Sequence, residues 1–134
     1  MGTSTAGIPH ATLVANILNL PMGYVRTNQI EGKCAPKIKV VVVEDLISTA
    51  SSCIEVVNVL RENDVEVLRV ASIFTYGMKK GIKRFNEANV KNVSVSNYDV
   101  LLEVAVKTNC IQKEDIKKLL AFRDNPSDAS WMDI

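Results

Sequence analysis

A run of four valines, Val40–Val43, constrains the fold of this chain more than any other feature. A strand with one solvated face alternates apolar and polar residues, and four consecutive valines leave no polar face. Such a run is typical of a strand in a parallel sheet that helices cover on both faces. The sequence therefore predicts an α/β fold in which Val40–Val43 form a buried, central strand.

Two carboxylates and a group of hydroxyls follow the valines. Glu44 and Asp45 come first, residues 48–52 follow with four hydroxyls, and apolar residues at helical spacing come next. A helix N-terminus offers free N–H groups and a partial positive charge, and hydroxyls add donors. Carboxylates accept hydrogen bonds from sugar hydroxyls or lie near a magnesium ion. This order outlines a phosphate and ribose site, although acidic residues after a buried strand also simply cap turns.

A second polar stretch lies at the start of the chain. Residues 2–7 are dense in glycine and hydroxyls, which predicts a loop, and Pro9 suits the first turn of a helix over residues up to about Leu18. A hydroxyl-rich loop that leads into a helix is again a candidate anion site. A plain N-terminal loop is the alternative that the residues alone leave open.

The remainder of the chain alternates between strand and helix patterns. We expect strands over residues 22–26, 65–74 and 90–95, and helices over about 54–61, 78–85, 99–105 and 113–122. Ser96 or Asn97 is expected to cap the third of these helices, with Val100, Leu101, Val104 and Ala105 facing inward. The alternation predicts a parallel sheet with helices on both faces. Ligands of such sheets bind beyond the carboxyl ends of the strands, where the polar segments should converge.

Composition excludes several classes of function. The 134 residues suit one domain, residues 1–134, and the net charge of +1 gives no pull toward nucleic acid or an anionic membrane. No apolar run approaches a membrane span, and the N-terminus lacks the pattern of a signal peptide. Three widely spaced cysteines and one histidine fit no zinc site and suggest a reducing cytoplasm. A basic cluster at residues 79–84 is interpreted as a solvated helix face, not a nucleic-acid surface.

The residues of these motifs resemble a known family. The string from Val42 to Thr49 closely resembles the phosphoribosyl pyrophosphate (PRPP) motif of type I phosphoribosyltransferases, and orotate phosphoribosyltransferases in particular. Residues 2–11 resemble the pyrophosphate loop of the same enzymes, and residues 97–105 and 123–131 resemble their C-terminal part. The resemblance covers nearly the whole chain and implies the type I phosphoribosyltransferase fold.

The resemblance also implies a reaction. Orotate and PRPP would give orotidine 5′-monophosphate and pyrophosphate, in the synthesis of UMP, with Mg²⁺ bound mainly through PRPP. A cytoplasmic homodimer is implied as well. The implied catalytic residues are Glu44, Asp45 and Arg26, and Ser48 and Tyr76 would contact the base. The implied PRPP-binding residues are Thr3, Ser4, Thr5, Ala6, Gly7, Glu44, Asp45, Ser48, Thr49, Ala50, Ser51 and Ser52.

The chain departs from the family pattern at three places. The family has a strand before the first loop, so a truncated or processed N-terminus is expected here. Only Thr27 separates Arg26 from Asn28, so the family's flexible loop, with its lysine and histidine, is absent. Ala50 replaces a usual glycine, and a left-handed conformation there would cost about 1–2 kcal/mol. A non-catalytic, PRPP-binding or dimerising regulatory domain on the same fold is therefore the alternative function.

Overall fold

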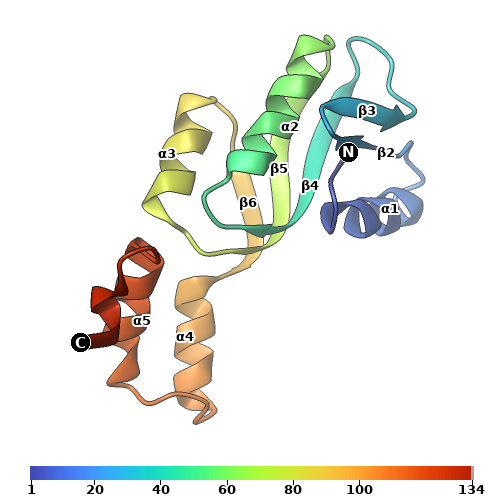
Figure 1. The fold of residues 1–134 in the computed structure, drawn as a ribbon. Helices are drawn as coiled ribbons and strands as arrows, with labels where there is room; N and C mark the ends of the chain where they lie inside the picture. Colours follow the sequence, from blue (N-terminus) through green and yellow to red (C-terminus); the bar gives the residue numbers. More distant parts are fainter. Residues whose placement is uncertain (134) are drawn as a thin grey trace.

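A single mixed sheet organises the structure, a computed structural model that describes residues 1–133 (Figure 1). Its strand order is β3-β2-β1-β4-β5-β6. The strands are β1 (Gly2–Thr3), β2 (Gly23–Arg26), β3 (Gln29–Gly32), β4 (Lys39–Ile47), β5 (Glu66–Thr75) and β6 (Asn92–Asn97). The helices are α1 (Gly7–Ile17), α2 (Ser51–Glu62), α3 (Lys79–Glu87), α4 (Tyr98–Lys107), α5 (Asp115–Asp124) and the short 3₁₀ segment η1 (Ala129–Asp133).

Strand β4 is central, as the valine run predicts. It pairs in parallel with β1 on one side and with β5 on the other, and only β3 runs antiparallel to its neighbour, β2. The strand is longer than expected, because it continues to Ile47 and Glu44 pairs with Ser72 of β5. Glu44 and Asp45 therefore lie within the strand, near its carboxyl end, and do not follow it.

The valines are not all buried. Val40 and Val42 join Val57 and Leu60 of α2 in the core, and Val42 is completely inaccessible. Val41 and Val43 lie on the opposite face, where Val41 is 36% exposed and Val43 is half-buried, so the expected burial of the whole run was wrong for these two residues. The reason is that the second face of the sheet has only partial helical cover.

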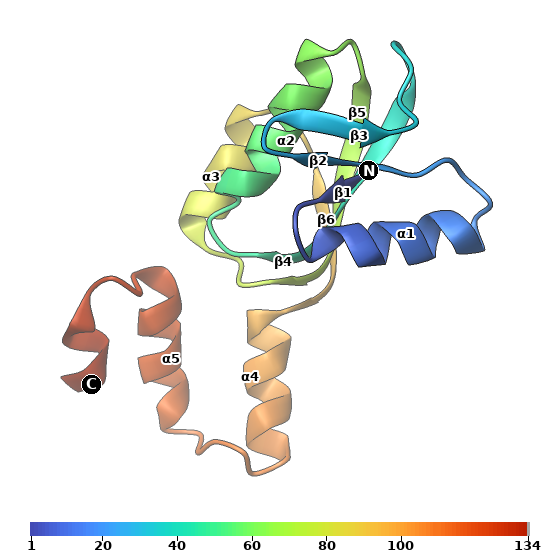
Figure 2. The ribbon, with the colours of Figure 1, turned by 45° about the vertical axis from the view of Figure 1, so that its right-hand side comes forward.

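Helix α1 provides that partial cover. Gly2 pairs with Val43 across the sheet, and a Cβ added at Gly2 would lie 2.9 Å from Ile8 Cα, so α1 packs on the Val43 face. Helices α2 and α3 cover the other face, as Figure 2 shows from the side. The expected helices on both faces are thus present. Along β6, however, Val95 is 87% exposed, because no described helix covers that part of the sheet.

Helices α4 and α5 form an arm that extends from the carboxyl end of β6 (Figure 1). The Asn97 side chain caps α4 and accepts a hydrogen bond of 3.0 Å from the Val100 N–H, which confirms one of the two expected caps. The expected inward face was wrong: Val100, Leu101 and Val104 are exposed, and Ala105 is only half-buried. Tyr98 and Leu102 are buried instead, because that side of α4 meets α5, where the Tyr98 hydroxyl donates to the Leu119 carbonyl at 3.3 Å.

The C-terminal segment folds back on the arm. The Trp131 ring meets the Phe122 ring edge to face, with 5.2 Å between the centroids, and Lys118 Nζ lies 5.9 Å from the Trp131 ring. Over residues 1–133 no helix has the length and apolar character to cross a membrane.

Candidate functional site

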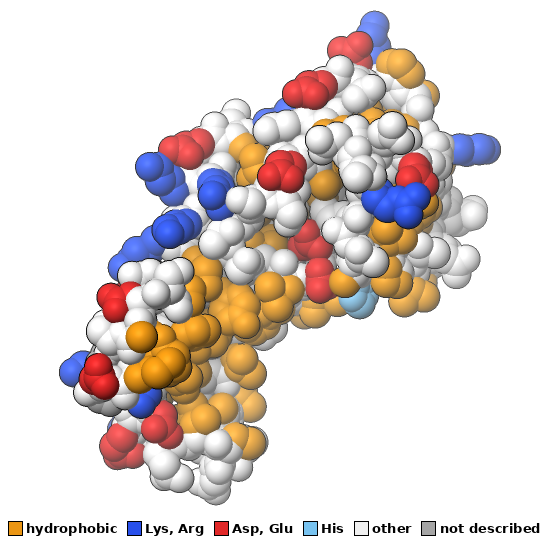
Figure 3. Space-filling view, viewed as in Figure 1, with side chains coloured by type: hydrophobic (Ala, Val, Ile, Leu, Met, Phe, Trp, Pro, Cys, Tyr) orange, Lys and Arg blue, Asp and Glu red, His pale blue; other side chains and the backbone are white. Residues whose placement is uncertain are grey.

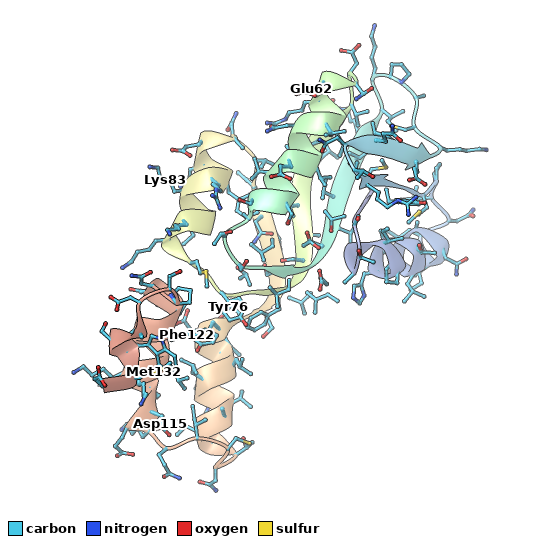
Figure 4. The ribbon with its side chains drawn as sticks, in the orientation of Figure 1. Glu62, Tyr76, Lys83, Asp115, Phe122 and Met132 are labelled. Carbon is cyan, nitrogen blue, oxygen red and sulfur yellow. The ribbon has the colours of Figure 1, made fainter. Side chains whose placement is uncertain are left out.

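Three polar segments meet at one edge of the sheet. Strands β1, β4 and β5 are parallel, so residues 4–6, the 48–52 turn and Tyr76–Gly77 all follow carboxyl ends of strands. The Tyr76 N–H donates a 2.9 Å hydrogen bond to the Ile47 carbonyl, which holds the third segment beside the second. Figure 4 shows Tyr76 at this end of the sheet, above α4. The edge therefore collects most of the polar residues that the sequence singled out.

The first loop, residues 4–6, lies against the carboxylates. Thr3 is buried, and its hydroxyl donates to the Val43 carbonyl at 3.3 Å, whereas Ser4 and Thr5 are exposed. A Cβ added at Gly7 would lie 2.6 Å from the Val43 carbonyl oxygen and 3.3 Å from Glu44 Cα. Only glycine permits this approach, so the chain after the first loop passes directly over the end of β4.

Glu44 and Asp45 supply the carboxyl groups at this edge of the sheet. Glu44 is 7% exposed and accepts a 3.1 Å hydrogen bond from the Asp45 N–H. Burial is the largest cause that raises the pKa of Glu44 to about 7, and the side-chain hydrogen bond with Asp45 adds to it. Near neutral pH a share of the Glu44 carboxyl is protonated. The pair can therefore both donate to and accept from hydroxyl groups of a ligand.

The 48–52 turn leads from β4 into α2. Ala50 is the N-cap of α2, with φ 62° and ψ 12°, so this residue has the left-handed conformation that costs an alanine about 1–2 kcal/mol. No side chain caps the helix, and the first N–H groups of any helix have no intrahelical partner. Ser51 and Ser52 are exposed beside these donors. The turn thus presents N–H groups, hydroxyls and the positive end of the α2 dipole together.

The left-handed conformation of Ala50 leads to a testable prediction about stability. Ala50→Val should lower the free energy of unfolding by about 2 kcal/mol or more, because a β-branched residue is strained at positive φ and the site is already packed. Ala50→Gly should change it by less than about 1 kcal/mol, since relief of strain offsets the added freedom of the unfolded chain. Urea unfolding measures both.

Ala88→Val is the matched control for this pair. Ala88 is a half-buried helix C-cap with an ordinary φ of −77°, so the extra methyl groups meet no backbone strain. Equal losses from Ala50→Val and Ala88→Val would show that the left-handed conformation is not the cause.

Arg26 ends β2 at the same edge but makes its contacts within its own hairpin. Its guanidinium forms an ion pair of 3.1 Å with Glu31, which also accepts from the Tyr24 hydroxyl at 2.5 Å. Thr27 and Asn28 both have positive φ, 47° and 59°, as in a type I′ turn. The hairpin therefore closes directly after Arg26. No described contact joins Arg26 to Glu44 or Asp45, so the structure places it near the other candidates without pairing it with them.

Relatives of known identity exist for almost the whole chain, although no family model matches it. The orotate phosphoribosyltransferase of Halalkalibacterium halodurans is 46% identical over 139 residues, which cover 98% of this chain and 66% of the relative. That of Bacillus pumilus is 49% identical over 140 residues, with the same coverage. The chain belongs to the orotate phosphoribosyltransferase family. It spans just under two thirds of the length of these relatives.

A solved structure of the family supports the fold. The crystal structure of orotate phosphoribosyltransferase from Aeropyrum pernix matches with a TM-score of 0.69 and 32% identity, over 82% of this chain and 62% of that one. The resemblance to type I phosphoribosyltransferases and the α/β fold that it implies are confirmed. The alignment with the H. halodurans protein runs over 139 residues, more than the 134 of this chain, so that family member carries residues that this chain lacks.

Two residues that contact the 48–52 turn were not predicted from the sequence. The Arg84 guanidinium of α3 donates to the Thr49 carbonyl at 2.7 Å, although the basic cluster was interpreted as solvated. A Cβ at Gly81 would lie 2.7 Å from the Ser48 carbonyl oxygen. The only available signal was a glycine inside a helical pattern, which often marks close packing. The rest of the cluster does form a solvated face, visible as Lys and Arg side chains along α3 in Figure 3, and Lys79 pairs with Asp124 at 2.8 Å.

Proposed function

We propose that this chain is a single orotate phosphoribosyltransferase core domain, residues 1–134. It transfers the ribose 5-phosphate of PRPP to orotate and yields orotidine 5′-monophosphate and pyrophosphate, a step in the synthesis of UMP. One observation carries the proposal: Gly7, directly after the first loop, packs on the backbone of Glu44, and the strand that holds Glu44 and Asp45 leads into the 48–52 turn. The names of the family members give the substrate, because they are orotate phosphoribosyltransferases.

Each part of PRPP has a matching group at this edge. The 5′-phosphate binds the 48–52 turn, where the free N–H groups of α2 and the Ser51 and Ser52 hydroxyls supply donors. The ribose hydroxyls bind Glu44 and Asp45. The pyrophosphate binds the first loop, through the exposed residues 4–6 and the backbone beside them, with Thr3 and Gly7 shaping the loop. Arg26 lies at the same edge of the sheet and offers a cation to the pyrophosphate.

The chemistry follows from these positions. A ring nitrogen of orotate gives up its proton to the departing pyrophosphate or to solvent and forms a bond to the anomeric carbon. The bond from that carbon to the pyrophosphate oxygen breaks, and its electron pair leaves with pyrophosphate. Positive charge develops on the ribose, next to the carboxylates Glu44 and Asp45. Negative charge develops on the leaving group, which the donors of the first loop and Arg26 stabilise. The residues thus place opposite charges at the two ends of the breaking bond.

Magnesium fits this site as part of the substrate complex. Within residues 1–133 no cluster of three or more carboxylate, histidine or cysteine ligands forms a metal cage. Mg²⁺ is commonly held by one or two carboxylates together with substrate phosphates, and Glu44 and Asp45 suit that arrangement. When bound, the ion neutralises charge on the pyrophosphate.

Tyr76 and Ser48 flank the place proposed for orotate. The Tyr76 ring lies 5.4 Å from that of Phe74 and 5.3 Å from that of Tyr98, measured between centroids. This group of aromatic rings stands beside the 48–52 turn and offers a flat surface to a planar base. We further propose that the enzyme works in the cytoplasm as a homodimer, and that neither nucleic acid nor a membrane is a partner.

Replacing Asp45 with asparagine tests the assignment of the ribose site. Asp45→Asn should weaken PRPP binding about tenfold or more, because a carboxylate that accepts from ribose hydroxyls becomes a neutral amide. Calorimetric titration with PRPP and Mg²⁺ measures the change. Asp64→Asn, at an exposed position between α2 and β5, is the control and should bind as the wild type does. Unchanged affinity in Asp45→Asn would remove Asp45 from the site.

A further inference from the structure

Helix α3 holds the backbone of the 48–52 turn through two contacts, which come from Arg84 and Gly81. Arg84 Nη1 donates a 2.7 Å hydrogen bond to the Thr49 carbonyl, and the side chain is half-buried. Gly81 lies so close to the turn that a Cβ there would be 2.7 Å from the Ser48 carbonyl oxygen and 3.6 Å from the Thr49 carbonyl carbon. We propose that Arg84 is a positioning residue, which orients the turn for the 5′-phosphate of PRPP. This inference rests on the proposed function.

Peptide geometry shows how Arg84 would act. In a trans peptide the C=O and the N–H point in opposite directions, and the only cis bond in residues 1–133 is Ser4–Thr5. The Thr49 carbonyl points toward α3, so the N–H of Ala50 points away from that helix. The Ser48 carbonyl also lies against α3, at Gly81, so the N–H of Thr49 points away as well. Successive N–H groups that point the same way form an anion site.

The hydrogen bond from Arg84 also helps to hold Ala50 in a strained backbone conformation. Ala50 has a left-handed conformation, which an alanine leaves readily. Rotation of the Thr49–Ala50 peptide would relieve that strain and would turn the Ala50 N–H away from the phosphate. Such a rotation breaks the bond from Arg84 to the Thr49 carbonyl, a charge-assisted bond in a partly buried setting. Arg84 therefore stabilises the conformation that binds the anion, without touching the anion itself.

Arg61 offers a comparison on the same pair of helices. Its guanidinium donates to the Ala88 carbonyl at 2.7 Å and to the Asn89 carbonyl at 3.3 Å, at the C-terminal end of α3. Arg61 reaches from α2 to the end of α3, and Arg84 reaches from α3 to the turn that precedes α2. Each arginine therefore links the two helices through a backbone carbonyl, but only Arg84 contacts the turn. A merely structural role predicts similar effects from removing either one. A positioning role predicts a change in phosphate binding from Arg84 alone.

Titration of the variants Arg84→Gln, Arg84→Lys and Arg61→Gln with two ligands separates these cases. Ribose 5-phosphate, which carries the 5′-phosphate, should bind Arg84→Gln about tenfold or more weakly than it binds the wild type. Arg84→Gln should bind inorganic pyrophosphate with Mg²⁺, the ligand of the first loop, within about twofold of the wild type, because Arg84 hydrogen-bonds to the 48–52 turn and not to that loop. Arg84→Lys keeps a donor, so its affinity for ribose 5-phosphate should lie between those of the wild type and Arg84→Gln. Arg61→Gln should bind both ligands as the wild type does.

The outcomes distinguish this inference from the proposed function. Wild-type protein that binds neither PRPP nor ribose 5-phosphate would refute the proposed function, and the inference with it. Wild-type binding that Arg84→Gln leaves unchanged would refute the positioning role alone. Equal weakening of both ligands, together with a lower unfolding temperature, would also overturn it, because it would show a general loss of structure.

Discussion

Replacing Glu44 with glutamine should stabilise the protein above neutral pH and flatten the pH dependence of its stability. Burial, with the Asp45 hydrogen bond, raises the pKa of Glu44 from 4.5 to about 7 in the folded state. Between these values the folded protein holds a proton that the unfolded chain has lost, so the free energy of unfolding falls as the pH rises. The whole effect amounts to at most about 3 kcal/mol at pH 8. Glutamine cannot ionise and avoids this loss.

Urea unfolding at pH 5 and pH 8 measures the effect in the absence of ligand. The wild type should lose stability between the two pH values, and Glu44→Gln should lose much less. Glu62→Gln is the control, because Glu62 is an exposed carboxylate at the end of α2, as Figure 4 shows. That variant should keep the wild-type difference. A Glu44→Gln protein that keeps it too would show that Glu44 titrates normally.

The sequence predicted the backbone of the site because its signals are local. The valine run placed β4, and the hydroxyls before a helical pattern placed the 48–52 turn. Ala50, where the family usually has a glycine, has the left-handed conformation that favours glycine. The same local signals did not predict which valines are buried. Val41 is partly exposed, because burial of a strand residue depends on whether a helix from elsewhere in the chain packs over it.

The predictions that failed depend on packing between distant elements. The apolar side of α4 that carries Val100 and Val104 was expected inward, yet α4 packs through Tyr98 and Leu102. Figure 3 shows hydrophobic side chains gathered on the surface where the sheet meets α4 and α5. Arg84 was missed for the same reason, since its partner lies 35 positions away in the sequence. Periodicity gives the faces of a helix, but not which face a neighbour will cover.

The hairpin that follows Arg26 leads to the prediction with the largest effect on turnover. Thr27 and Asn28 close it in two residues, where the family resemblance places a flexible loop with a lysine and a histidine. Inserting that loop between Arg26 and Asn28 should raise the rate of orotate consumption about a hundredfold or more, because its donors stabilise charge on the departing pyrophosphate. The affinity for PRPP should change little, since contacts made mainly in the transition state affect turnover more than binding. Absorbance of orotate and calorimetry with PRPP measure the two quantities.

A loop of the same length, built from glycine and serine, is the matched control for the insertion. It has the same effect on the hairpin, where lengthening a two-residue turn to about ten residues costs on the order of 1–2 kcal/mol. It supplies no cation, so its turnover should stay at the wild-type level. If the glycine and serine loop raises turnover as much, exclusion of water by the loop is the cause and not its charged groups. If the wild type already turns orotate over as fast as the protein with the lysine and histidine loop, the two-residue turn is no impediment. In that case Arg26 and the first loop alone stabilise the leaving pyrophosphate.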